Sequence, residues 1–162
     1  MRLDPDRLAE LRRLSILDSS KERAYDDITR LLAASLAVPI TMVNLLDAER
    51  DWFKSCAGIQ QTQSPAVTSF CEAFFDSTAD VIVVEDTLED HRFQRHPLVA
   101  GRPFIRFYAA ARLVVNRQTV GTLCAYDVQP RQLSTQQLGD LQLMAGAVVE
   151  LLSQRVMAQR RA

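Results

Sequence analysis

The stretch that decides the fold runs from Ile105 to Val128. It reads IRFYAAARLVV, then NRQ, then TVGTLCAYDV. Two β-rich runs separated by a short polar segment that starts with Asn predict a β-hairpin. In the first run every odd position is apolar, whereas the even positions include Arg106, Tyr108 and Arg112. That strand therefore has one packing face and one mixed face.

The second run is apolar or small on both faces, which is typical of a strand covered on both sides. Polar side chains on a covered sheet need partners, because buried polar groups left unpaired are costly. Arg106 can pair with Asp86 or Glu85 at the end of the preceding strand, or its guanidinium can bind a ligand carboxylate. The sequence leaves both alternatives open.

The turn of the hairpin sets which face Cys124 occupies. A two-residue and a three-residue turn at Asn116 differ by one position in register, and a slip of one residue reverses the face. Arg112, near the turn, is expected to be solvated.

Length and composition indicate a single ordinary domain. The chain has 162 residues, 48% apolar and 24% charged, with a net charge of -1. There is no basic stripe for nucleic acid, no apolar run that could span a bilayer and no signal-peptide core. Three widely spaced cysteines argue against a disulfide framework. We therefore expect a cytoplasmic protein without nucleic-acid or membrane partners.

Periodicity and capping patterns predict the remaining elements. Helices are expected from Asp4 to about Ser15, behind the Ser19–Glu22 capping box as far as Leu36, over 68–76 with Ser69 and Glu72 as a capping box, and from Ser134 onward. Strands are expected over 40–47, 51–57 and 81–84, with a loop over 58–65 and a long polar lid over 87–104. Short turns between neighbouring strands predict an α+β fold around a mainly antiparallel sheet of five to six strands.

Several short motifs, in order along nearly the whole chain, resemble those of the GAF domain family. They are WFKS at 52–55, SFC at 69–71, DHRF at 90–93, PLV at 97–99, IRFY at 105–108 and GTLCAYD at 121–127. The chain is most similar to GAF modules that precede histidine kinase or GGDEF diguanylate cyclase output domains. The resemblance implies a single domain over 1–162 with a core of about 15–155. It also implies that the N- and C-terminal helices share one face of the sheet, and that the short helix and the lid enclose a pocket on the other.

The ligand of such a pocket is not indicated by the motifs. The Asn-Lys-x-x-x-Phe-x-x-x-Asp-Glu signature of cyclic-nucleotide-binding members is absent, as is a bilin-attachment segment. No cofactor can therefore be named. The residues expected to contact a small-molecule ligand are the aromatic and polar side chains of the sheet and lid: Trp52, Phe70, Cys71, Phe74, Asp86, Phe93, Arg106 and Tyr108. Core packing is the alternative for each aromatic residue.

The cysteines and histidines leave further alternatives. Cys71 lies in the first turn of the expected helix, where a thiol pKa is lowered, but cysteine is also a common core residue. A GAF-fold methionine sulfoxide reductase would need two of Cys56, Cys71 and Cys124 at one pocket. The spacing of His91 and His96 does not match a metal site. We expect no catalytic residues in this chain.

The terminal helices predict self-association. Residues 134–162 carry an apolar arc wider than one contact needs, and residues 1–17 carry a thin Leu stripe suited to a partner helix. The sequence thus predicts a small-molecule-sensing regulatory domain that dimerises through its end helices and acts on a downstream kinase or diguanylate cyclase. The alternatives are a dimerisation module without a ligand and the reductase.

Overall fold

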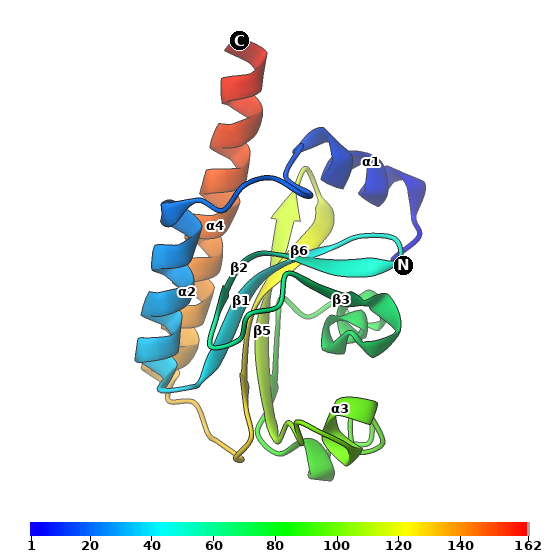
Figure 1. Ribbon diagram of the computed structural model, residues 1–162, viewed down its shortest axis with the longest axis vertical. Coiled ribbons are helices and arrows are strands. Elements are labelled where there is room, and N and C mark those ends of the chain that lie inside the picture. The colour runs from blue at the N-terminus through cyan, green and yellow to red at the C-terminus, as the bar shows by residue number, and fades with distance from the viewer. Residues whose placement is uncertain (162) are drawn as a thin grey trace.

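The computed structural model describes residues 1–161 and has one six-stranded antiparallel sheet in the order β3-β2-β1-β6-β5-β4 (Figure 1). The strands are β1 (Ile40–Leu46), β2 (Arg50–Ala57), β3 (Gln63–Pro65), β4 (Val81–Val84), β5 (Phe107–Val115) and β6 (Gln118–Asp127). The helices are α1 (Pro5–Arg13), α2 (Arg23–Leu36), α3 (Pro97–Ala100) and α4 (Thr135–Arg161), with 3₁₀ helices η1 (Ala66–Thr68), η2 (Phe70–Asp76) and η3 (Thr87–Glu89). The α+β class is confirmed. The sixth strand, β3, lies in the segment expected to be a loop.

The β5–β6 hairpin is closed by a two-residue turn. Asn116 and Arg117 have φ values of 48° and 66°, as in the turns whose twist matches paired strands. The resulting register places Tyr108 opposite Tyr126 and Ala110 opposite Cys124. Cys124 therefore shares a face with Tyr108, which settles the question left open by the sequence.

Helices α2 and α4 lie side by side on one face of the sheet (Figure 1). Their buried side chains form one core with the facing strand residues. This core includes Tyr25, Leu32 and Leu36 of α2, Leu141, Val148 and Leu152 of α4, and Phe107, Leu113 and Leu123 of the sheet. The expected capping box at the start of α4 is present, because Gln137 N–H donates to Ser134 Oγ at 3.1 Å and Ser134 N–H donates to Gln137 Oε1 at 2.9 Å.

Helix α1 lies across the end of the sheet near the β5–β6 turn and packs on β6 (Figure 1). Its Leu stripe is buried inside this domain, with Leu11 and Leu14 fully covered. The interpretation of that stripe as a surface for a partner helix was therefore wrong. Past the end of α1, Arg155 of α4 donates to the carbonyl oxygens of Leu14 at 2.9 Å and Ser15 at 2.7 Å.

The start of α2 also differs from the expectation. Its N-cap is Glu22, and no side chain caps the helix. Ser19, the expected capping residue, donates instead to the carbonyl oxygen of Ile16 and accepts from Lys54 Nζ at 2.9 Å. The buried Lys54 ammonium donates to this hydroxyl and also forms an ion pair with Glu22 at 2.7 Å. Both residues of the expected capping box, Ser19 and Glu22, therefore bind Lys54 instead of capping the helix.

The other face of the sheet carries a second core, which η2 and the segment 87–104 cover. The segment 87–104 contains η3 and α3, and it buries Phe93 and Val99 in this core. The expectation of an ordered lid agrees with this packing. Within residues 1–161, no helix combines the length and apolar character that crossing a bilayer requires.

Candidate functional site

A pocket of about 570 Å³ opens on the sheet face opposite α2 and α4. The segments 59–70 and 98–105 border it, and its walls are mostly apolar. The wall residues include Met42, Phe53, Phe70, Leu98, Ile105 and Tyr126. A volume of a few hundred Å³ with apolar walls and few polar groups is typical of small-molecule sites.

Three buried polar side chains form the floor of this pocket. They are Asn44 in the middle of β1, Asp51 in β2, and Ser69 just before η2. Asn44 pairs with Thr122 of β6, next to Gly121. A Cβ at Gly121 would lie 2.2 Å from the Asn44 carbonyl oxygen, so the close approach of β1 and β6 here requires glycine.

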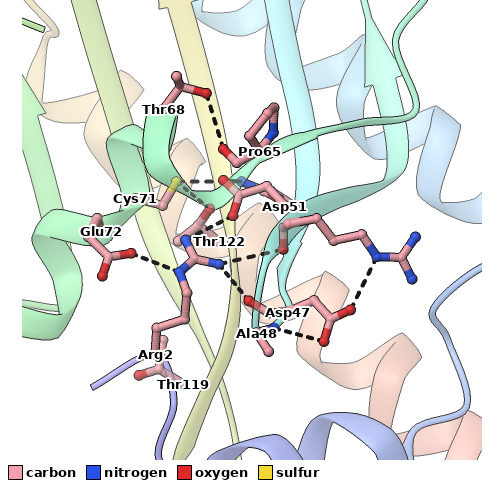
Figure 2. A network of polar contacts seen from close by, with 12 residues as sticks. Arg2, Asp47, Ala48, Asp51, Pro65, Thr68, Cys71, Glu72, Thr119 and Thr122 are labelled. Carbon is pink, nitrogen blue, oxygen red and sulfur yellow. Dashed lines mark hydrogen bonds and ion pairs between the residues drawn. The ribbon is translucent and has the colours of Figure 1, made fainter.

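An ion-pair network joins the floor to the N-terminal segment (Figure 2). The Arg2 guanidinium lies 2.9 Å from Asp51 and 2.8 Å from Glu72, and it donates to the carbonyl oxygen of Asp47 at 2.7 Å. Asn44 Nδ2 donates to the other Asp51 oxygen at 3.0 Å. Burial raises the pKa of the Asp51 carboxyl, although Arg2 opposes this shift. The Asp51 carboxylate at the floor thus shares its counter-charge, the Arg2 guanidinium, with Glu72.

Cys71 lies behind this floor in a buried polar cluster. Its Sγ is 3.1 Å from Tyr108 Oη, 3.0 Å from Thr122 Oγ1 and 3.7 Å from Asn44 Nδ2. The expected Ser69–Glu72 capping box does not form: η2 is a 3₁₀ helix without a side-chain cap, and Glu72 pairs with Arg2. Burial raises the pKa of the Tyr108 phenol well above its usual range. These contacts favour a packing role for Cys71.

The three cysteines do not meet at the pocket. Cys71 and Cys124 are both fully buried, and Cys56 lies half-buried at the end of β2. All three are free thiols, and none lines the pocket. The Cys71 and Cys124 thiols lie close enough to interact with each other, but both are fully buried away from the pocket, which disfavours the reductase alternative.

Of the eight residues expected to contact a ligand, the structure places Phe70 in the pocket wall. Phe74, Phe93, Cys71 and Tyr108 are buried in the core behind it. Trp52 belongs to the core on the opposite face, where the Lys21 ammonium lies 4.7 Å from its ring.

The two remaining residues, Arg106 and Asp86, bind each other. Arg106 Nε and Nη2 donate to the two Asp86 oxygens at 3.1 and 3.0 Å, outside the pocket lining. This bidentate pair is the protein-partner alternative that the sequence left open. Arg112, expected to be solvated, donates instead to the carbonyl oxygens of Phe74 at 3.1 Å and Ser77 at 2.9 Å.

His96 has a structural role beside Phe70 of the pocket wall. Its Nδ1 accepts from the Leu98 N–H at 3.0 Å and so caps α3, while its ring lies 4.2 Å from the Phe70 ring. Burial lowers the pKa of this imidazole. No His, Cys, Asp and Glu side chains gather into a metal-binding group among residues 1–161.

The sequence analysis missed the floor residues Asp51 and Ser69, and it also missed Arg2, the ion-pair partner of Asp51. One signal was visible: Asn44 is the only amide side chain in β1, whose other residues apart from Thr41 are apolar. A buried strand residue of that type requires partners, and those partners came from distant segments.

The sheet has helices on one face and a pocket on the other. This arrangement is typical of one class of regulatory domain. The chain belongs to the GAF domain family, whose model matches residues 20–155. GAF domains are mainly sensory modules of signalling proteins.

Comparisons with individual proteins agree with this assignment. The chain is 33% identical over 126 residues to the cyclic di-GMP phosphodiesterase PA2567 of Pseudomonas aeruginosa, covering 77% of this chain. The match spans 21% of that relative's length. Two solved structures share the fold. The GAF domain of an Acinetobacter phosphoenolpyruvate-protein phosphotransferase has a TM-score of 0.66 at 14% identity, covering 98% of this chain and 99% of that one. The chromophore-binding domain of the bacteriophytochrome RpBphP3 from R. palustris has a TM-score of 0.68 at 11% identity, covering 93% and 61%.

Proposed function

We propose that this domain senses a small molecule, which binds in the pocket between the sheet and the segments 59–70 and 98–105. The observation that carries the proposal is the composition of the pocket: about 570 Å³ with apolar walls over the buried polar floor of Asn44, Asp51 and Ser69. A core that served packing alone would not gain from burying polar groups beneath an opening, because such groups are stabilising only when their hydrogen bonds are satisfied.

Native mass spectrometry of the protein purified from its source tests this proposal. We expect a bound small molecule, and we expect its loss in Ser64→Trp, which places an indole in the pocket from β3. The matched control is Gln63→Trp, because neighbouring strand residues point to opposite faces. An empty wild-type pocket would contradict the proposal and would favour a dimerisation module without a ligand.

The proposed biological context is cytoplasmic signal transduction with an attached or associated output domain. The similarity to a cyclic di-GMP phosphodiesterase supports cyclic di-GMP signalling as that context, and a kinase or diguanylate cyclase as the regulated domain is the related alternative. Expression of the domain fused to the relative's output region would test it, with phosphodiesterase activity measured with and without the retained ligand. Equal activity in both states would contradict the proposal.

Homodimerisation through α4 is the second part of the proposal. Leu143 on the outer surface of α4 is 75% exposed, and Met157 and Leu31 are also exposed on the α2–α4 layer. We expect Leu143→Glu to convert a dimer to a monomer in light-scattering measurements of mass. Leu88→Glu is the control, because Leu88 is an exposed leucine outside this layer. A wild-type protein that is monomeric at high concentration would contradict this part.

A further inference from the structure

The polar atoms at the pocket floor indicate the chemical class of the ligand. Asn44 is 1% exposed, Asp51 is 2% exposed and Ser69 is 9% exposed, so all three are nearly cut off from solvent. Asn44 Nδ2 donates to Asp51, which fixes the orientation of the amide and leaves Oδ1 as its other polar atom. Asn44 Oδ1 has no hydrogen-bond partner within residues 1–161.

Within residues 1–161, the atoms of the floor residues without a hydrogen-bond partner are Asn44 Oδ1, Asp51 Oδ1 and Ser69 Oγ; the Arg2 Nη2 donor, which forms an ion pair with Asp51, also lacks one. Asn44 Oδ1 and the Asp51 carboxylate can only accept, and the Ser69 hydroxyl can accept or donate. An acceptor buried without a donor is destabilising, because it has lost its hydrogen bonds to water. An occupant that brings donors recovers that cost, whereas one that brings a further acceptor, such as a carboxylate, adds repulsion.

The charges around Asp51 also favour a ligand that carries hydrogen-bond donors. Arg2 is shared between Asp51 and Glu72, so the Asp51 carboxylate does not have a full counter-charge of its own. Arg7 donates to the carbonyl oxygens of Arg2 and Thr119 and forms no ion pair with Asp51 within the described residues, so Arg2 is the direct counter-charge of that carboxylate. Arg102 borders the pocket but is exposed, so solvent screens its charge more than that of the buried carboxylate.

The walls suit the body of an organic cation. Phe53, Phe70 and Tyr126 surround the space above the floor, and aromatic faces attract cations as well as apolar groups. We propose, on the basis of the sensing function proposed above, that the ligand is a small primary amine with an apolar body. Its ammonium group donates to Asn44 Oδ1, Asp51 and Ser69, and its body lies against the aromatic wall.

Matched sets of probes test this assignment by calorimetry on the full chain. The first set is phenethylamine, 2-phenylethanol and phenylacetate, and the second is hexylamine, hexanol and hexanoate. We expect the amine of each set to bind at least about 10-fold more tightly than the isosteric alcohol, since one charge-assisted hydrogen bond contributes about 1.5–3 kcal/mol. An alcohol or carboxylate that binds as tightly as its amine would overturn the assignment.

Variants of the floor give an independent readout. We expect Ser69→Ala and Asp51→Asn to weaken amine binding by a larger factor than alcohol binding, because the alcohol hydroxyl makes fewer and uncharged hydrogen bonds, and Ser64→Ala at the border is the control. Amine affinity that is the same in wild type and in a natively folded Asp51→Asn would overturn the assignment. If native mass spectrometry instead finds a neutral or anionic molecule that Ser64→Trp excludes, the amine assignment fails and the sensing function stands. If no probe or retained molecule binds, both fail.

Discussion

Replacing Arg2 should destabilise the domain strongly, because Arg2 compensates a carboxylate at the floor of the pocket. Its guanidinium is 6% exposed, lies 2.9 Å from Asp51 and makes further bonds to Glu72 and to a backbone carbonyl. Removing one member of a buried ion pair costs about 3–5 kcal/mol. We therefore expect Arg2→Met to lower the free energy of unfolding by about 3–5 kcal/mol.

Urea denaturation followed by circular dichroism measures this loss. With a denaturant slope of about 2 kcal/mol per M, the midpoint should fall by roughly 2 M. Arg12→Met on α1 is the control, since Arg12 is exposed and forms no ion pair within the described part of the chain; its midpoint should stay within about 0.3 M of wild type.

A double-mutant cycle decides whether the loss arises from the ion pair. In an Asp51→Asn background the carboxylate is gone, so Arg2→Met should cost at least about 1 kcal/mol less there than in wild type. Equal costs in both backgrounds, or a loss below about 1 kcal/mol in wild type, would refute the reasoning that Arg2 serves as the counter-charge of Asp51.

Three further predictions concern neighbouring features. Gly121→Ala should lower the free energy of unfolding by about 3 kcal/mol or more, because its Cβ would meet the Asn44 carbonyl oxygen at 2.2 Å; a thermal melt near that of wild type would contradict this. Since burial lowers the pKa of His96, the unfolded state binds a proton more readily, so stability should fall as the pH drops below about 6.5. The loss of stability between pH 7.5 and pH 5.5 should be smaller in His96→Asn, whose side chain can still cap α3. Urea melts at both pH values measure this loss, and an equal loss in wild type and in the variant would contradict the prediction. Arg106→Ala should change stability little and leave ligand binding intact, because its ion pair is partly exposed and outside the pocket; a loss of binding in calorimetry would place it back in the site.

The fold could be predicted from the sequence because its signals are local. The β5–β6 hairpin follows from an alternating strand, a polar turn starting at Asn116 and a second apolar strand, all within 105–128. The capping box of Ser134 and Gln137 lies within four residues and forms as expected. Short-range patterns of this kind report backbone geometry directly.

The pocket floor could not be predicted, because its contacts connect distant segments. Asp51 binds Arg2 and Asn44, and nothing in the pattern around Arg2 indicates that it is buried. The same holds for the expected capping boxes at Ser19 and Ser69: each has the correct spacing, but Lys54 and Arg2 take their partners. Tertiary ion pairs prevailed over local capping there. Strand β3 was missed because three residues carry too little alternation to identify.

The two ends of α1 are anchored to different parts of the domain. At its start, the preceding Arg2 is bound to the pocket floor, and past its end the carbonyl oxygens of Leu14 and Ser15 are bound by Arg155 of α4. This short helix therefore connects the floor of the pocket to α4, the long helix that projects beyond the sheet (Figure 1). A movement of Arg2 along the α1 axis would either pull on α4 or break the bonds of Arg155.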